Sequence, residues 1–249
     1  MRIVVSPDYQ HLAYWGKQVP GLFATDSGEL LYNGRNQVRL FVVDGQKLVV
    51  KRFKRNDLFK QVVYTFFRKN KARRSFENAV MLRQNGFNTP HEVAYIEETA
   101  CGLITQVYYI CAYTDRLPIR PRLIEQEPFD KPLAVAYARY VASLHQAGIL
   151  HCDLNPTNVL VDGEAHFELI DINRMQFFDG PVPKKRCMEN LTLFYWLTPA
   201  YRFILEEYAH QRGWTDEDIK EAIRIKERHD KLWILRKKIT HLGRYEVSH

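Results

Sequence analysis

Two dipeptides near the N-terminus constrain the fold of this chain more than any other feature. Asn33-Gly34 and Asp44-Gly45 each lie between short segments rich in β-branched and aromatic residues. Asn, Asp and Gly tolerate the positive φ angles that tight hairpins need, so the pattern predicts a three-stranded antiparallel meander. The predicted strands are residues 28–32, 37–43 and 47–53.

A helix and two further strands are predicted after the meander. Residues 73–85 carry apolar side chains at helical spacing, and the pattern stops at Gly86 with Pro90 just beyond it, as is typical of a helix end. Strands are expected at 92–96 and 102–110. Residues 117–128 contain three prolines and no periodicity, so this segment is expected to be a connector.

The second half of the chain is predicted to be mainly helical. Asp130 can cap a helix that has Pro132 in its first turn and that ends at Gly148. Two short strands, 159–161 and 167–170, flank the turn Asp162-Gly163. From about Met188 onward the sequence favours helices, the last of which is basic and spans roughly 216–238.

Composition limits the kind of protein this can be. The 249 residues are 46% hydrophobic and carry a net charge of +7, which suffices for a real core and favours an anionic partner. No apolar run of about 18 residues is present, and the short apolar stretch before Pro7 is too short for a signal peptide. The four cysteines form no CxxC pair. We therefore expect a cytoplasmic protein with reduced thiols.

The stretch that carries chemistry is His151-Cys-Asp-Leu-Asn-Pro-Thr-Asn158, which is followed by a hairpin and Asp171. It resembles the catalytic core of the protein-kinase-like superfamily, where H-x-D-L-x-x-x-N is followed by a strand and a metal-binding D-x-x motif. The resemblance implies a phosphotransferase that uses ATP and Mg²⁺. It implies an α+β, two-lobed fold with a β-rich N-lobe containing one long helix and a small, mainly helical C-lobe. We expect one kinase-like domain, with the N-lobe at 1–107 and the C-lobe at 108–249.

Within this resemblance, five residues take specific roles. Asp153 would accept the proton of the acceptor hydroxyl, while Asn158 and Asp171 would hold magnesium on the nucleotide phosphates. Lys51, on the third strand, would grip the α- and β-phosphates, and Glu77 on the following helix would be its ion-pair partner.

The rest of the nucleotide site follows the pattern less closely. Gly34 and Arg35 lie in the hairpin that would cover the phosphates, although the superfamily loop is richer in glycine. The adenine-binding hinge is expected within 106–109, so Gln106 and Tyr108 are assigned to it. Two histidines of the region are expected to be structural rather than catalytic; they are His145 and His151.

Several departures argue against an ordinary regulated protein kinase. The metal motif lacks a final glycine, no A-P-E element follows it, and Asn155 stands where peptide kinases have a lysine.

Other features resemble the lipopolysaccharide core kinases, in particular the 3-deoxy-D-manno-octulosonic acid (Kdo) kinases. Residues 51–74 hold ten basic residues and one acidic residue, interleaved with aromatic side chains. The helix that follows begins with the R-x-x-E pattern Arg74-Ser-Phe-Glu77, and the metal motif reads Ile170-Asp-Ile-Asn-Arg174. The basic segment 51–74 is interpreted either as a solvated helical insertion or as a surface that meets an anionic membrane or acceptor.

This resemblance implies transfer of the γ-phosphate of ATP to a sugar hydroxyl, in particular that of Kdo on lipid A. The partners would be this anionic glycolipid and, peripherally, the cytoplasmic face of the inner membrane. Alternatives are a core heptose kinase, an atypical Ser/Thr/Tyr protein kinase without an activation segment, and a pseudokinase used as a binding module. No obligate protein partner is identified, and without a groove-reading motif a nucleic-acid binder ranks last.

Overall fold

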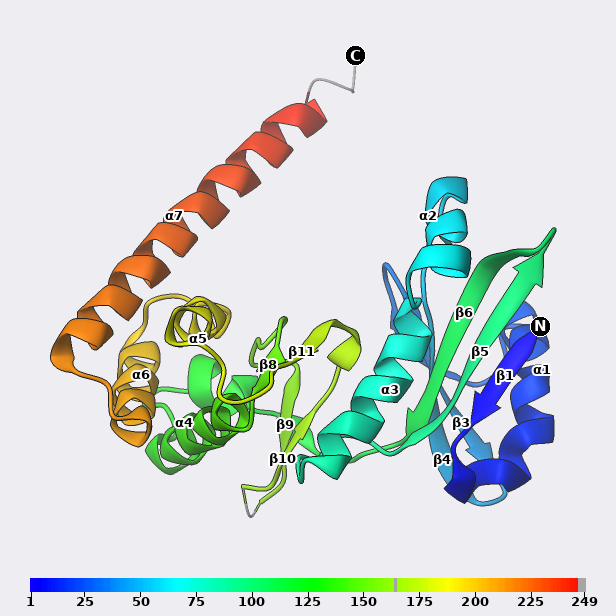
Figure 1. Ribbon diagram of the computed structural model, residues 1–249, viewed down its shortest axis with the longest axis horizontal. Coiled ribbons are helices and arrows are strands. Elements are labelled where there is room, and N and C mark those ends of the chain that lie inside the picture. The colour runs from blue at the N-terminus through cyan, green and yellow to red at the C-terminus, as the bar shows by residue number, and fades with distance from the viewer. Residues whose placement is uncertain (164, 246–249) are drawn as a thin grey trace. The chain divides into compact units, whose positions relative to one another are not determined.

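The computed structural model describes residues 1–163 and 165–245, and the chain forms two compact units (Figure 1). The first unit contains Met1–Arg116 and Glu168–Arg174; the second contains Leu117–Phe167 and the chain from Met175 onward. The boundary lies later than the expected 107/108, because the last strand of the first unit continues to Ala112.

The first unit is built on one antiparallel sheet with the strand order β1-β5-β6-β4-β3-β2. The predicted meander is confirmed, since β3 pairs with both β2 and β4. Asp44 and Gly45 both have positive φ angles, of 49° and 76°, which suits a tight hairpin. The strands are β1 (Arg2–Val5), β2 (Glu29–Asn33), β3 (Gln37–Val43), β4 (Gln46–Arg52), β5 (Glu92–Ala100) and β6 (Leu103–Ala112).

Helices α1 and α3 contribute buried side chains to two separate hydrophobic clusters that also contain residues of the sheet. Val19 and Phe23 of α1 lie in one buried cluster with Tyr108 and Ile110, whereas α3 contributes Ala72 to another cluster. This second cluster contains Val107 and Tyr109 of the same strand, as the alternation of strand side chains requires. The helical segments are η1 (Pro7–Leu12), α1 (Ala13–Ala24), α2 (Leu58–Val62), the π-helical turn η2 (Val63–Phe67) and α3 (Lys71–Gln84).

The second unit is mainly helical. Its first helix, α4, begins where expected: the side chain of Asp130 accepts a hydrogen bond from the backbone of Leu133, and Gly148 follows the helix with a positive φ. Helix α4 packs on α6, and α5 on α7 (Figure 1). These helices are α4 (Lys131–Gln146), α5 (Lys184–Leu191), α6 (Pro199–Arg212) and α7 (Asp216–Tyr245).

Short strands frame the polar loop of this unit. Strand β8 pairs with β11, and β7 pairs with β9, all antiparallel. The short elements of this unit are β7 (Leu117–Pro118), η3 (Pro121–Glu125), β8 (Ile149–His151), β9 (Val159–Val161) and β11 (Met175–Phe177). Two more, β10 (Phe167–Leu169) and η4 (Ile172–Arg174), lie in the segment that belongs almost entirely to the first unit. Across the described residues, no helix has both the length and the apolar character needed to cross a membrane.

Candidate active site

The loop between β8 and β9 is held by hydrogen bonds among its own polar residues. The backbone carbonyl of Asp153 accepts from the backbone N–H of Asn155 at 2.8 Å and from Nδ2 of Asn158 at 2.9 Å. Asn158 thus turns back across the loop. Because its side-chain nitrogen is used in this bond, its side-chain oxygen is the atom left to face a cation.

The carboxylate of Asp153 is half-buried and oriented by its neighbours. Nδ2 of Asn155 donates to its Oδ1 at 3.2 Å. The backbone N–H of Asp153 donates to Nδ1 of His151 at 3.1 Å, which fixes the start of the loop. A carboxylate positioned in this way is chemically suited to accept a proton from a nearby hydroxyl.

Both histidines of the region are buried, as expected of structural residues. The two ring nitrogens of His145 contact the hydroxyl of Tyr208 at 2.8 Å and Oδ1 of Asn190 at 3.0 Å. Nδ2 of Asn190 in turn donates to the carbonyl of His151 at 2.9 Å. Burial lowers the pKa of His145 to about 4, so its ring is neutral at pH 7 and joins α4, α5 and α6 to the start of the loop.

In the first unit, Lys51 on β4 forms an ion pair with Asp171, 120 residues further along the chain. Nζ of Lys51 lies 2.8 Å from Oδ1 of Asp171, and Nδ2 of Asn173 donates to the same oxygen at 2.6 Å. Asp171 has a φ angle of 55°, a left-handed conformation that Asp adopts more readily than most residues.

The segment that carries Asp171 is fixed to the α3–β5 region. Its Leu169 exchanges hydrogen bonds there, donating its backbone N–H to the carbonyl of Asn88 at 3.0 Å and accepting from the hydroxyl of Thr89 at 2.7 Å. Nδ2 of Asn78 on α3 donates to the carbonyl of Ile172 at 2.7 Å. These bonds on both sides of Asp171 place its carboxylate beside Lys51.

Glu77 does not form the expected ion pair with Lys51 in this structure. Its carboxylate lies 2.8 Å from Nζ of Lys69 and 2.9 Å from Nε of Arg73. Burial raises the pKa of Glu77, but the hydrogen bonds from Lys69 and Arg73 outweigh burial and hold this pKa below its ordinary value. The carboxylate of Glu77 is therefore paired with Lys69 and Arg73, whereas Lys51 is paired with Asp171.

Several cations act electrostatically on Lys71, and the sequence did not identify them as a group. Burial and the repulsion of Arg35, Arg174 and Arg74 lower the pKa of Lys71, while Asp171 opposes this shift. Among the described residues, no group accepts a hydrogen bond from the buried Nε of Arg74. Cations that repel one another in this way are a chemical match for the several negative charges of a nucleotide phosphate chain.

The hairpin residue Gly34 is constrained by the ring of Tyr32. A side chain at Gly34 would place its Cβ 2.2 Å from the hydroxyl of Tyr32. The backbone N–H of Gly34 donates to the carbonyl of Asn36 at 3.1 Å. This amide is therefore used within the hairpin, and Arg35 is the hairpin residue whose charge acts on Lys71 and lowers its pKa.

Gln106 and Tyr108 do not lie in a hinge, which corrects their assignment. Both lie inside β6, and Nε2 of Gln106 donates to the carbonyl of Phe53 at 2.5 Å. The ring of Tyr108 is buried, and its hydroxyl donates to Glu98 at 2.8 Å; burial raises the pKa of this hydroxyl. The expected strand 102–110 already contained both residues, and the observed strand continues to Ala112, so a hinge can begin only after Ala112.

The predicted metal ligands have oxygen atoms of the kinds that Mg²⁺ accepts. The described residues contain no cluster of three or more His, Cys, Asp or Glu side chains that could hold a metal. Asp171, of the first unit, offers a carboxylate oxygen, and Asn158, of the second unit, offers an amide oxygen. Mg²⁺ is typically bound by one or two carboxylates and completes its shell with substrate phosphates and water. That these two residues hold Mg²⁺ stays a prediction.

Similar proteins point to one family. The model described as "Lipopolysaccharide kinase (Kdo/WaaP) family" matches residues 125–225, which include the loop with Asp153 and Asn158 as well as Asp171. A 3-deoxy-D-manno-octulosonic acid kinase of Photobacterium profundum is 25% identical over 176 residues, which cover 68% of this chain and 74% of that protein. A second protein of this name, from Vibrio parahaemolyticus, is 23% identical over 167 residues, or 64% of this chain and 68% of the relative.

A solved structure shares the fold. The structure described as "WaaP in complex with acyl carrier protein" covers 93% of this chain and 98% of its own, with a TM-score of 0.63 and 19% identity. The α+β, kinase-like fold is thereby shown. The family model and the two relatives show that the chain is similar to the lipopolysaccharide kinase (Kdo/WaaP) family and indicate a kinase that acts on a sugar hydroxyl.

Proposed function

We propose that this kinase transfers the γ-phosphate of ATP to a hydroxyl of Kdo on lipid A. The observation that carries the proposal is the 2.8 Å pair between Lys51 and Asp171, which joins a phosphate-binding cation to a metal-binding carboxylate. The acceptor is proposed because the two curated relatives are named as Kdo kinases. A core heptose kinase would use the same residues, and the acceptor alone distinguishes it.

The residues divide the chemistry between them. Lys51, Arg35 and Lys71 would hold the phosphates of ATP in place, and Asp153 would accept the proton of the attacking sugar hydroxyl. Asp171 and Asn158 would hold Mg²⁺, which when bound neutralises charge that develops on the phosphates. Asn155 orients the carboxylate of Asp153 and so assists without taking up a proton.

The test is transfer of labelled γ-phosphate from Mg-ATP to three acceptors: Kdo–lipid A, a heptose-extended core with its Kdo already phosphorylated, and a generic protein. We expect label on Kdo–lipid A, and a loss of kcat of about 10²- to 10⁴-fold in the Asp153→Asn variant. Asp179→Asn, a carboxylate of the second unit outside the loop, is the matched control and should retain full activity.

The other acceptors separate the alternatives. Label on the heptose-extended core alone would make the protein a heptose kinase. Label on protein that depends on Asp153, with none on either lipid, would reject the sugar acceptor and favour an atypical protein kinase.

We also propose that residues 57–67 bind the surface of an anionic bilayer and so bring the enzyme to its lipid acceptor. This interfacial segment comprises α2 and η2 (Figure 1). Four large apolar side chains in it are strongly exposed: Leu58 (72%), Phe59 (77%), Phe66 (68%) and Phe67 (81%). Basic residues flank it on both sides, at Lys54 and Arg55 and at Arg68 and Lys69. Exposed aromatic side chains beside cations are the combination that favours an anionic membrane interface.

Co-sedimentation with vesicles tests this contact. The wild type should bind vesicles containing phosphatidylglycerol more tightly than pure phosphatidylcholine vesicles, and added salt should weaken the binding. The double variant Phe59→Ser/Phe67→Ser should bind vesicles about tenfold more weakly, since it lacks the two exposed rings that would enter the bilayer interface. Tyr14→Ser, a 76% exposed aromatic residue of α1, is the control and should bind as the wild type does.

An acyl carrier protein is included as a competing partner because the solved neighbour is in complex with one. Binding of acyl carrier protein that needs Phe59 and Phe67, without any binding to vesicles, would replace the bilayer as the partner of this segment. Equal vesicle binding by the wild type and the double variant would reject the segment as a membrane contact.

A further inference from the structure

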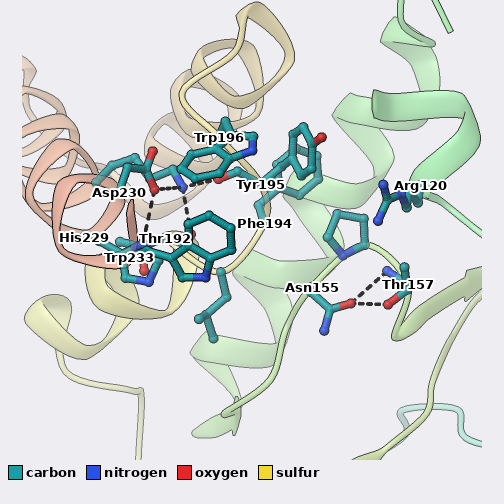
Figure 2. A pocket seen from close by; sticks show the side chains of 13 residues that line it. Arg120, Asn155, Thr157, Thr192, Phe194, Tyr195, Trp196, His229, Asp230 and Trp233 are labelled. Carbon is teal, nitrogen blue, oxygen red and sulfur yellow. Dashed lines mark hydrogen bonds and ion pairs between the residues drawn. The ribbon is translucent and has the colours of Figure 1, made fainter. Parts of the chain in front are cut away.

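The second unit has a pocket of about 450 Å³ next to the polar loop (Figure 2). Asn155 and Thr157 of the loop line one side of it, and Trp233 of α7 lines another. Residues 192–196, between α5 and α6, supply Tyr195 and Trp196, and Arg120 lies at the end nearest to Thr157 (Figure 2). The pocket is therefore built entirely within one unit, from segments far apart in the chain.

A single hydrogen bond links Asn155, which lines the pocket, to the proposed base Asp153. Nδ2 of Asn155 donates to the carboxylate of Asp153 at 3.2 Å. Oδ1 of Asn155 accepts from the backbone N–H of Thr157 at 3.0 Å and also from the hydroxyl of Thr157. A molecule that fills the pocket would therefore contact Asn155, the residue that donates to the proposed base, while Asp153 itself is not among the residues that line the pocket.

The wall opposite the loop is aromatic and offers flat apolar surface. The rings of Trp196 and Trp233 meet nearly at right angles, at 84°, with their centroids 4.8 Å apart. Trp233 is 39% exposed. Aromatic faces combined with a few polar groups are typical of small-molecule sites, and the apolar face of a sugar ring can pack on them.

Arg120 is the cation that the pocket can offer to a ligand. Its Nε donates to Glu125 at 2.7 Å, and its guanidinium lies 5.8 Å from the centre of the Tyr195 ring. Within the described residues, its two terminal nitrogens have no hydrogen-bond acceptor. A guanidinium fixed at Nε, with both terminal nitrogens available, is suited to bind a carboxylate.

The other charged residues of the pocket neutralise one another. Nζ of the buried Lys226 donates to the carbonyl of Thr192 at 3.0 Å, to the carbonyl of Tyr195 and to Oδ1 of Asp230 at 2.7 Å. All three of its protons are therefore used to join α7 to the 192–195 segment. Nδ1 of His229 also lies 3.2 Å from Oδ1 of Asp230. Asp230 is thus compensated by Lys226, whereas Arg120, although paired with Glu125 through Nε, keeps its terminal nitrogens as the cationic donors that the pocket can offer.

We infer that this pocket binds the acceptor sugar by its carboxylate, with Arg120 as the carboxylate-binding residue and Trp196 and Trp233 packed against the sugar ring. The inference rests on the proposed function, because it assumes that the acceptor is a sugar acid. It adds the residues that recognise this acid and that distinguish it from a neutral sugar. In this arrangement the sugar hydroxyl that reacts would face Asn155 and Asp153.

Binding of free Kdo is measured first, because it needs no turnover. Two of the four tryptophans of the chain line the pocket, so Kdo should change the intrinsic fluorescence of the enzyme, whereas an equal concentration of neutral mannose should not. Arg120→Gln should weaken Kdo binding by about tenfold or more, as expected for the loss of a charged hydrogen-bond partner. Arg139→Gln, an exposed arginine of α4 outside the pocket, should bind as the wild type does.

Steady-state kinetics with Kdo–lipid A give the second measurement. Arg120→Gln and Trp233→Ala should each raise KM for the lipid by about tenfold, with KM for ATP unchanged. Leu232→Ala, an exposed apolar neighbour of Trp233 on the same helix, is the control and should leave KM unchanged.

The outcomes separate this inference from the proposed function. Transfer of phosphate to Kdo–lipid A with KM unaltered in both pocket variants would overturn the inference and leave the function intact. Equal binding of Kdo and mannose would also overturn it. Kdo binding that needs Arg120, in an enzyme that transfers phosphate only to another acceptor, would support the pocket and reject Kdo as the acceptor.

Discussion

His145 shows how a single buried side chain makes the stability of this protein depend on pH. Its neutral ring links Tyr208 to Asn190 in the core of the second unit. A charged ring there would lose hydration and place a proton on a nitrogen that accepts the hydroxyl of Tyr208. The folded protein therefore resists protonation of His145, whereas the unfolded chain does not.

The folded protein should lose stability between pH 6.5 and about pH 4. In this window the unfolded state takes up a proton at His145 and the folded state, with a pKa of about 4, does not, so the free energy of unfolding falls as pH falls. The full effect is about 3 kcal/mol. Urea denaturation at a series of pH values measures it.

The matched variant is His145→Gln, which removes the titrating group. It should be less stable than the wild type at pH 7, because the bonds to Tyr208 and Asn190 are disturbed. Its stability should also change less between pH 6.5 and pH 4. An unaltered slope in this variant would show that other residues cause the pH dependence.

At the residue scale, the expected turn of Asn158 back toward Asp153 agrees with the structure, whereas the expected pair of Lys51 with Glu77 does not. The spacing from Asp153 to Asn158 is local, so one turn determines how their side chains meet. Several cations lie close enough in sequence to pair with Glu77, and in the structure its carboxylate pairs with Lys69 and Arg73. A motif read along the chain cannot rank such competing partners.

Helix ends illustrate what the sequence determines at the scale of elements. Asp130 caps α4 through the backbone N–H of Leu133 and also pairs with Arg122 at 2.7 Å. Asp57 caps α2 in the same way, through the backbone N–H of Lys60. The two caps are similar locally, but α4 contributes to the core of its unit whereas α2 is short and exposed.

The two caps should therefore differ in their effect on stability. Asp130→Ala should lower the free energy of unfolding by about 1–2 kcal/mol. Asp57→Ala should leave the midpoint of global unfolding unchanged, because fraying of α2 exposes little additional surface. Chemical denaturation of both variants measures this. An equal loss in the two variants would mean that α2 unfolds together with the rest of the protein.

The elements that escaped prediction depend on distant contacts. Helix α1 contains Gly16 and Pro20, which ordinarily argue against a helix. A side chain at Gly16 would meet Ile3 of β1 at 2.4 Å, so the glycine allows the helix and the strand to approach closely. Strands β8 and β11 are each only three residues long, and their pairing cannot be recognised from local propensity.

At the scale of the whole molecule, the chain returns to its first unit for one short segment, after residues 117–167 have formed the first part of the second unit. Residues 168–174 belong with the first unit and bring Asp171 to Lys51. The sequence predicted the two-part organisation from its change of composition, but it could not indicate this return, which depends on bonds such as that from Asn78 to Ile172. The unit boundary lies after Arg116 and not at the expected 107/108 for another reason, because β6 continues to Ala112.

Mg-ATP should raise the thermal stability of the protein, because its proposed ligands are ordered in the folded state only. At a concentration about 100 times its Kd, a ligand contributes about 2.7 kcal/mol. Differential scanning fluorimetry should show a higher Tm with Mg-ATP than with ATP and EDTA.

Lys51→Met should abolish this increase in Tm. Lys17→Met, an exposed lysine of α1, should preserve it. A full increase in the Lys51 variant would remove Lys51 from the nucleotide site.

Trp233 stands on the last helix of the chain, whereas Asn155 stands in the loop that carries the proposed base. In the proposed arrangement, the residues that bind the acceptor sugar come from several stretches of sequence, with Arg120 well before the loop and Trp233 well after it. Substitutions at these positions are therefore expected to alter which sugar is accepted while the loop that carries Asp153 keeps its sequence. New acceptor preferences would be engineered by changing Arg120, Trp196 and Trp233 together, and not by exchanging one helix.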